Sequence, residues 1–256
     1  MKATIQHNEK TFRVDLSRPL DISIPLSPQG PRAWYVDPIK ISPVINAHFA
    51  GSVALNGSVN FNNIFFNPHG HGTHTESVGH ITREFVSVNQ SLQRYFFDAL
   101  LITIDPILAT EDGLITKKGD KLITAKQLAM AIGSQRPEAL ILRTRPNEGS
   151  KCHTNYSDTN FPYFESEALK LLADFGVEHL LVDLPSVDRE SDGGALLAHH
   201  AFWNHPMATR QHCTITEFIF VSDRIADGEY LLNLQTAPFE NDATPSRPVL
   251  YQIERS

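Results

Sequence analysis

The sequence predicts a mixed α/β domain, and three observations support that prediction. Helix and strand patterns alternate through the middle of the chain, strand patterns occupy both ends, and no repeat or low-complexity linker divides it. With 256 residues, of which 41% are hydrophobic, the protein can bury one sizeable core. We therefore expect residues 1–256 to form a single α/β domain around a mixed sheet.

The amino-terminal part combines a hairpin pattern with a proline-rich segment. Residues 4–6 and 11–14 are expected to pair as two strands around Asn8, Glu9 and Lys10. Residues 17–46 contain six prolines, which predict a long ordered loop with short strands. Loops of this length inside a compact domain are often functional.

The middle and the carboxyl-terminal part alternate between the two kinds of element. Residues 99–105 and 139–144 are expected to be strands, and the second is a short apolar run typical of a buried strand. Thr124 and Gln127 form a capping-box pattern, which predicts a helix over residues 125–132. Residues 165–175 have apolar side chains at helical spacing before Gly176, which predicts an amphipathic helix. The remaining expected elements are strand 179–184, helix 194–203 and strands 214–221, 229–235 and 249–253.

Charge and composition narrow the possible partners. The chain has 22 basic and 29 acidic residues and no basic run, so we expect no nucleic acid and no membrane partner. Its apolar runs are too short to span a bilayer, and the first residues lack the apolar region of a signal peptide. The two cysteines, Cys152 and Cys213, form no ligand pattern. A cytoplasmic protein that acts on a small molecule is expected.

A histidine cluster is the strongest functional signal in the chain. Residues 69–80 contain four of the twelve histidines together with a glutamate, namely His69, His71, His74, His80 and Glu76. Histidine and carboxylate are ligands of zinc, manganese and iron, and histidine also transfers protons near neutral pH. The segment therefore predicts a metal site with an acid–base group, and the alternative is a polar surface loop.

The backbone of this cluster is expected to be extended. The β-branched Thr73 and Thr75 favour strand geometry, in which residues two apart share a face. His74, Glu76 and His80 could then point the same way. The second half of the chain contains further candidate ligands, namely His199, His200 and Glu217. His205 and His212 are additional candidates. For each of these histidines the alternative is an ordinary surface or core role. Glu217 lies in an apolar strand pattern, and a carboxylate buried there needs a cation or hydrogen-bond donors.

These residues resemble the metal-dependent cyclase family, which includes bacterial kynurenine formamidase and isatin hydrolase. Residues 72–80 are similar to the later part of the family signature H-x-G-T-H-x-D-x-P-x-H. Further matches are Asp-Ile-Ser-Ile-Pro-Leu at 21–26, Trp34, Leu-Arg-Thr at 142–144, Asp-Leu-Pro-Ser-Val-Asp at 183–188, and the late His199 and Glu217. The matches extend over almost the whole chain.

The resemblance implies a swivelling β/β/α domain that forms a homodimer or a larger homo-oligomer. It also implies one or two divalent cations, with Zn²⁺ expected first and Mn²⁺ as the alternative. By position, His74, Glu76, His199 and Glu217 match metal ligands, with His200 as the alternative to His199, and His80 matches the family's proton-transfer histidine.

The chain departs from the family signature at three positions. Gly70 stands where the family has its first histidine, so His69 or His71 would have to take that place, and we favour His69. Glu76 replaces an aspartate and Val78 replaces a proline.

The expected activity is hydrolysis of an amide, lactam or related carbonyl compound, as in an arylformamidase. A metal-bound water would be the nucleophile, and His80 would carry a proton to the leaving group. Trp34 would pack on a planar substrate, or simply fill space. Arg143 is expected to pair with an internal carboxylate, and Asp183 and Asp188 to organise the turn around Pro185. The alternatives are a cyclase or lyase that acts through an enolate, and a non-catalytic ligand-binding homologue.

Overall fold

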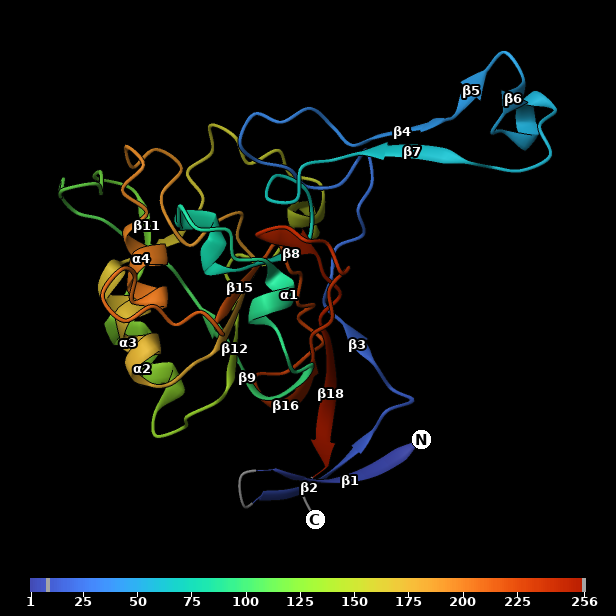
Figure 1. Ribbon diagram of the computed structural model, residues 1–256. Helices are drawn as coiled ribbons and strands as arrows, with labels where there is room; N and C mark the ends of the chain where they lie inside the picture. Colours follow the sequence, from blue (N-terminus) through green and yellow to red (C-terminus); the bar gives the residue numbers. More distant parts are fainter. Residues whose placement is uncertain (8–9, 255–256) are drawn as a thin grey trace.

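Four parallel strands form the centre of the protein, for which the computed structural model describes residues 1–7 and 10–254 (Figure 1). They are β9 (Phe96–Ile104), β12 (Ala139–Thr144), β14 (His179–Val182) and β15 (Thr214–Glu217), and they lie side by side in that order. All residues of β12, β14 and β15 are buried, as expected for parallel strands covered on both faces.

Antiparallel strands extend this sheet on both sides. Beyond β9 lie β16 (Gly228–Asn233), β18 (Val249–Glu254), β2 (Lys10–Asp15) and β1 (Lys2–His7), and β3 (Leu20–Asp21) also pairs with β18. Beyond β15 lie β8 (His74–Glu76) and β17 (Ala243–Pro245). The mixed α/β class predicted from the sequence is confirmed, whereas the swivelling type and the single-domain assignment stay predictions.

Three helices cover one face of the central strands (Figure 1). They are α2 (Ala125–Ile132), α3 (Ser166–Asp174) and α4 (Leu197–Trp203), while the one-turn α1 (Val88–Ser91) lies near β8. Alternation along β12 divides the core, because Leu140 and Leu142 pack under the helices and Ala139 and Ile141 pack on the opposite side. No helix among the described residues is long and apolar enough to cross a membrane.

Local sequence signals account for several element boundaries. The Thr124 hydroxyl accepts a hydrogen bond from the Gln127 amide, and the Gln127 side chain accepts one from the Thr124 amide, which confirms the predicted capping box. The predicted strand 214–221 is too long: β15 stops at Glu217, because Phe218 adopts a left-handed backbone with φ of 55°. The predicted hairpin is confirmed by the pairing of β1 with β2, but its turn at Asn8 and Glu9 lies outside the described residues.

An arm projects from the body between residues 40 and 65, and the sequence patterns did not predict it (Figure 1). Strand β4 (Lys40–Pro43) pairs antiparallel with β7 (Asn62–Phe65) to make its stalk. The short strands β5 (Ile45–Asn46) and β6 (Phe49–Ala50) and the 3-10 turn η1 (Val53–Leu55) form its tip. The proline-rich segment therefore ends in an extended ribbon.

A small second sheet and two 3-10 turns complete the described elements. The second sheet consists of β10 (Ile107–Leu108), β11 (Lys121–Ile123) and β13 (Tyr163–Phe164). The turns are η2 (Val78–Ile81) and η3 (Gly149–Cys152). Because β12, β14 and β15 are parallel, Thr144, Asp183 and Glu217 at or just after their carboxyl ends come to one edge of the main sheet, where open α/β sheets place their sites.

Core packing around β12 predicts how the stability of the protein responds to truncation of a buried side chain. Replacing the fully buried Leu140 by alanine removes apolar contact and leaves a cavity, so the free energy of unfolding should fall by about 2–5 kcal/mol. Urea denaturation measures this change. The control is Leu114→Ala, because Leu114 is 92% exposed and its loss should cost less than about 0.5 kcal/mol. Equal losses in the two variants would contradict the assigned core.

Candidate metal centre

The pairing of β8 with β15 brings the histidine segment to the edge of the parallel sheet. Their antiparallel register sets His74 opposite Glu217, and Glu76 lies two residues further along the same face. All three side chains are buried, with exposures of 0%, 4% and 1%. The extended geometry predicted for His74 and Glu76 is confirmed.

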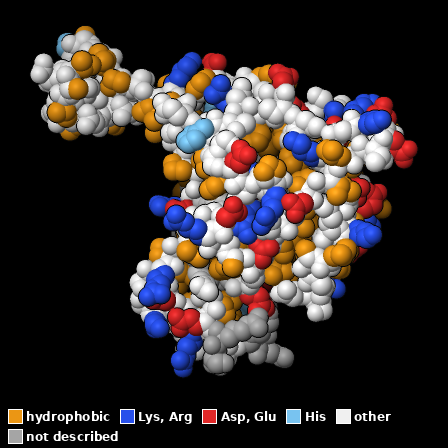
Figure 2. All heavy atoms as spheres, turned by 180° about the vertical axis from the view of Figure 1, so that it is seen from behind, with side chains coloured by type: hydrophobic (Ala, Val, Ile, Leu, Met, Phe, Trp, Pro, Cys, Tyr) orange, Lys and Arg blue, Asp and Glu red, His pale blue; other side chains and the backbone are white. Residues whose placement is uncertain are grey.

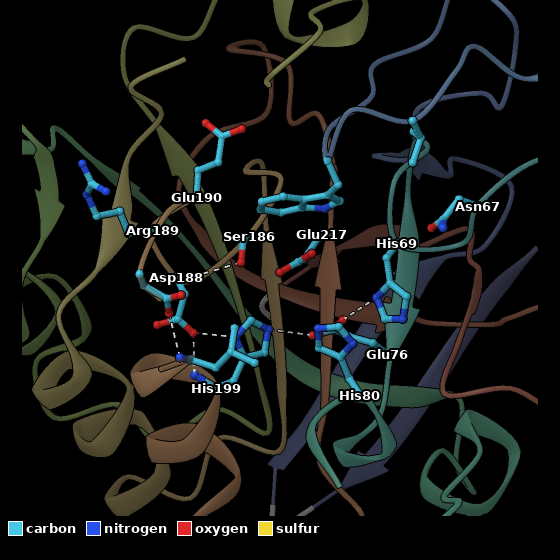
Figure 3. A pocket seen from close by; sticks show the side chains of 14 residues that line it. Asn67, His69, Glu76, His80, Ser186, Asp188, Arg189, Glu190, His199 and Glu217 are labelled. Atoms are coloured by element: carbon cyan, nitrogen blue, oxygen red, sulfur yellow. Dashed lines mark hydrogen bonds and ion pairs between the residues drawn. The ribbon is translucent and has the colours of Figure 1, made fainter. Parts of the chain in front are cut away.

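His69 reaches the same place from the loop before β8. Its Nδ1 lies 3.0 Å from Oε2 of Glu76 (Figure 3). Its Nε2 lies 2.8 Å from Oδ2 of Asp242. His69 therefore stands between two carboxylates, one inside the cluster and one behind it.

His199 enters from the helix side, on α4. Its Nε2 lies 3.1 Å from Oε1 of Glu76, and its Nδ1 lies 2.5 Å from Oδ2 of Asp188 (Figure 3). The Asp188 carboxylate also accepts hydrogen bonds from the backbone amides of Ala198 and His199 at the start of α4. One aspartate thus fixes both the helix and the ring that the helix carries.

His74 is held on one side and lacks a hydrogen bond on the other. Its Nδ1 lies 3.1 Å from the Gly72 carbonyl oxygen, and its Nε2 lies 3.4 Å from Oε2 of Glu217 without hydrogen-bond geometry. Among the described residues, neither this Nε2 nor Oε1 of Glu217 has a hydrogen-bond partner, although both atoms are buried. Unsatisfied buried polar atoms are costly, and these two lie in the same cluster.

The three histidines share one arrangement that suits metal binding. Each has one ring nitrogen beside an outer oxygen, supplied by Asp242, Asp188 or the Gly72 carbonyl. The other nitrogen of each ring faces Glu76 or Glu217. Histidines that coordinate metals are held in this way, because the outer acceptor fixes the tautomer and the ring orientation. Ligand atoms of His69, His74 and Glu76 lie within 4.8 Å of one another, as do those of Glu76, His80 and His199.

Charges within the cluster shift several pKa values. Burial favours neutral forms, but the charge of His80 and hydrogen bonds from His199 and His69 lower the pKa of Glu76 well below its usual range. Burial opposes charge on His69 as well, yet Asp242 and Glu76 raise the pKa of His69 to about 10. Burial and the neighbouring Glu76 raise the pKa of Glu217. A divalent cation between the carboxylates would relieve their repulsion, so the donor set fits such an ion.

His80 joins the site by a different route from the one expected. The extended backbone ends at Glu76, and His80 lies on the 3-10 turn η2, so the argument from strand alternation is wrong for this residue. The turn nevertheless brings its ring 4.2 Å from that of His69 and 5.4 Å from that of His199, measured between centroids. Its Nδ1 lies 3.7 Å from Oδ2 of Asp242, and its side chain keeps 29% exposure at the rim.

The histidines named as alternatives lie outside the cluster. His71 is buried beneath the loop, where its Nε2 lies 2.8 Å from the Asp37 carbonyl oxygen and its Nδ1 accepts a hydrogen bond from the Asn67 amide. His200 stacks on His205 instead of facing Glu76. His212 lines a separate cavity beside Arg94 and His179. Geometry therefore places His69 rather than His71, and His199 rather than His200, in the site.

Gly70 stands where the family signature has a histidine, and its surroundings leave little room for a side chain. A Cβ built on Gly70 would lie 2.8 Å from Cγ2 of Val36. Val36 thus closes the direction in which a histidine at position 70 would leave the backbone.

Sequence reasoning missed Asp242 and assigned two other aspartates wrongly. Asp242 lies just before β17, 173 residues from His69, and belongs to no motif that we recognised. Asp183 and Asp188 make long-range contacts instead of organising the Pro185 turn. Asp183 accepts hydrogen bonds from the Thr144 amide and hydroxyl and pairs with Lys151 at 2.7 Å, while Asp188 holds His199. Arg143 pairs with Asp227 at 2.8 Å, as expected for a link to a carboxylate.

A cavity of about 430 Å³ opens in front of the cluster. Apolar side chains of Trp34, Val36 and Leu196 line part of it, and polar groups complete the wall, including Ser186, Asp188, Arg189 and Glu190 (Figure 3). The ring of Trp34 packs edge-on against Phe161, with centroids 6.2 Å apart. A pocket of this size and mixed lining can hold a small planar molecule.

Solved structures share the fold of this protein. A structure described as a predicted metal-dependent hydrolase from Bacillus stearothermophilus aligns with a TM-score of 0.62 and 16% identity, over 91% of this chain and 98% of that one. Isatin hydrolase A from Labrenzia aggregata aligns with a TM-score of 0.66 and 14% identity, over 93% and 94%. At these identities the likeness shows the fold alone.

Sequence comparison gives the family. Kynurenine formamidase from Bacillus anthracis is 30% identical over 117 residues, which are 45% of this chain and 50% of the relative. Kynurenine formamidase from Bacillus thuringiensis strain Al Hakam matches to the same extent, so the chain spans about half the length of the curated relatives it matches. The family described as putative cyclase matches residues 14–189, which confirms the resemblance seen in the motifs. Because this match covers more than half of its length, the chain belongs to the putative cyclase family.

Proposed function

We propose that this protein is a metal-dependent hydrolase that acts on an amide, a lactam or a related carbonyl group of a small planar molecule. The observation that carries the proposal is the set of three histidines, each held by an outer oxygen while its other nitrogen faces Glu76 or Glu217. The names of the relatives, kynurenine formamidase and isatin hydrolase, support the same class of substrate.

The proposed metal ligands are Nδ1 of His69, Nε2 of His74, Nε2 of His199 and the carboxylates of Glu76 and Glu217. Nitrogen and oxygen donors in this combination suit Zn²⁺, with Mn²⁺ as the alternative. A divalent cation held there lowers the pKa of a coordinated water toward neutrality and polarises a substrate carbonyl. The set offers three ring nitrogens and two carboxylates, so we propose that it holds one or two ions.

His80 is the proposed proton carrier. It lies at the rim of the cluster, beside His69 and His199, and remains partly exposed to the cavity. Asp242 faces its Nδ1, which leaves Nε2 to take a proton and to deliver it to the leaving nitrogen or oxygen. Trp34 would pack on the planar part of the substrate, with Val36 and Leu196 excluding water around it.

Metal content is the first test of this proposal. Protein purified without chelator should contain a divalent transition metal by elemental analysis. After metal removal, adding Zn²⁺ or Mn²⁺ at 100 times the Kd should stabilise the fold by about 2.7 kcal/mol, which is roughly 5–10 °C in Tm. His74→Ala should abolish this gain, whereas His200→Ala on the outer side of α4 should keep it. Repeated absence of metal without any gain in Tm would refute the proposed site.

The role of His80 predicts a separation between metal binding and turnover. His80→Ala should keep the metal, because the proposed ligands remain, but lose roughly 10²–10⁴-fold in kcat. The rate would be measured on the best substrate from a screen of N-formyl arylamines, lactams and lactones. His212→Ala, which changes an exposed histidine outside the site, is the control. Full turnover in His80→Ala would exclude this role, and metal binding without turnover on any substrate would favour a non-catalytic binding protein.

The contact between Asp242 and His69 predicts an effect on metal affinity. Asp242→Asn removes the carboxylate that fixes the ring of His69, so the affinity for Zn²⁺ should fall roughly 10–100-fold. Competition with a chromophoric chelator measures this affinity. Asp174→Asn, which changes an exposed residue of α3, should leave it unchanged. Equal affinity in Asp242→Asn and the unmodified protein would exclude the orienting role.

A further inference from the structure

A second cavity lies at the opposite edge of the parallel sheet from the histidine cluster. Its volume is about 580 Å³, compared with about 430 Å³ for the cavity at the metal centre. Phe97 near the start of β9 and His179 at the start of β14 both line it, so it sits at the amino ends of these parallel strands. Among the described residues, the two cavities share no lining residue. The second cavity is therefore separate from the proposed metal centre.

The wall of the second cavity is mainly polar. Half of its ten lining residues carry an amide or a hydroxyl group, namely Gln90, Ser91, Gln93, Thr209 and Gln211. Pockets that hold drug-like molecules are lined predominantly by apolar and aromatic side chains. The lining of this cavity instead favours a hydrophilic ligand.

Two buried polar side chains in the wall have unused hydrogen-bonding capacity. Ser91 is 4% exposed, and its hydroxyl oxygen has no hydrogen-bond partner among the described residues. His179 is 3% exposed, and its Nδ1 lies 2.9 Å from Oγ1 of Thr214. Its Nε2 makes no hydrogen bond within the described part of the chain and lies 3.9 Å from Oε2 of Glu178. Because buried polar groups normally have partners, polar groups of a ligand in the cavity would satisfy them.

Arg94 adds hydrogen-bond donors at the mouth of the cavity. Its side chain is 51% exposed, and its two terminal nitrogens lie 3.1 Å from Oε1 of Glu138 and 2.9 Å from Oε2 of Glu178. A guanidinium carries five N–H donors, so these two contacts leave three for a ligand. Gln211 is also exposed, and its side-chain amide makes no hydrogen bond within the residues that the structure describes. Donors and acceptors therefore lie together around the opening.

The charges in the wall favour an uncharged ligand. The positive Arg94 and the negative Glu178 pair with each other, so neither has an unopposed charge to offer. Burial and the nearby Arg94 lower the pKa of His179 to about 3, so its ring is neutral near pH 7. On the face of the body seen in Figure 2, acidic and basic side chains are interspersed rather than gathered by sign. A charged molecule would therefore gain little from this wall.

Hydroxyl groups match this mixture of partners, because each hydroxyl can both donate and accept a hydrogen bond. They can accept from the free N–H groups of Arg94 and donate to the carboxylate of Glu178, and they can bond to Nε2 of His179 in either tautomer. The volume of the cavity is in the range of small-molecule sites. We propose that the second cavity binds a small uncharged molecule with several hydroxyl groups, such as a monosaccharide or a sugar alcohol. This proposal does not depend on the proposed activity.

Saturation-transfer difference NMR on the full chain tests the proposal. The probes are D-glucose, D-ribose, D-mannitol and myo-inositol, and at least one should bind with a Kd of about 10 mM or lower. Arg94→Ala combined with Gln211→Ala removes two exposed donors from the cavity, so this Kd should rise at least about 10-fold. The matched control is Arg83→Ala with Gln252→Ala, which changes two exposed residues outside the cavity and should leave the Kd unchanged.

Further measurements keep the outcomes distinct. Far-UV circular dichroism shows whether the cavity variant is folded, and Arg94→Lys with Gln211→Ala replaces it if it is not. Failure of all four probes to bind at about 100 mM would overturn the proposal, as would an equal Kd in the cavity variant and the control. Sodium acetate and methylammonium chloride serve as charged probes. If one of them binds and loses affinity in the cavity variant while the neutral probes do not bind, the ligand is charged and the proposal is wrong.

Discussion

The pairing of β8 with β15 is the contact on which the rest of the structure depends. It joins the amino-terminal histidine segment to the carboxyl end of the parallel strands and sets His74 opposite Glu217. On the other face, the hydroxyls of Thr75 and Thr216 lie 2.8 Å apart. A shift of one residue would break this contact and turn every ligand candidate on β8 away from the cavity. The metal chemistry proposed for this protein therefore rests on one short strand register.

Burial of negative charge is the second constraint, and the surrounding histidines stabilise the buried carboxylates. Glu76 and Glu217 are both nearly inaccessible to water, and each has at least one histidine nitrogen within about 3.5 Å. Asp188 and Asp242 stand behind two of those rings, so negative groups surround the histidines on both sides. Such a cluster is poorly suited to a stable core and well suited to a cation. Holding these groups in fixed positions is therefore expected to cost stability.

Local patterns in the sequence correctly predicted the elements whose structure depends on neighbouring residues. The capping box at Thr124, the apolar run at β12 and the alternation of His74 with Glu76 each need only neighbouring residues. The position of Asp242 could not be predicted, because only the pairing of β17 with β8 brings that loop to His69. The arm was not predicted for a different reason. Its strands bury neither face, so they lack the hydrophobic alternation by which strands are recognised.

The close approach of Val36 to Gly70 makes these two positions epistatic. Any side chain at position 70 requires Val36 to shrink or move, and valine has little rotameric freedom with which to move. A smaller residue at position 36 alone would leave a gap in the cavity wall. A change from the arrangement that uses His69 to one with a histidine at position 70 therefore requires substitutions at both positions 36 and 70. Single-residue exchange between the two would pass through an intermediate that packs poorly or lacks a ligand.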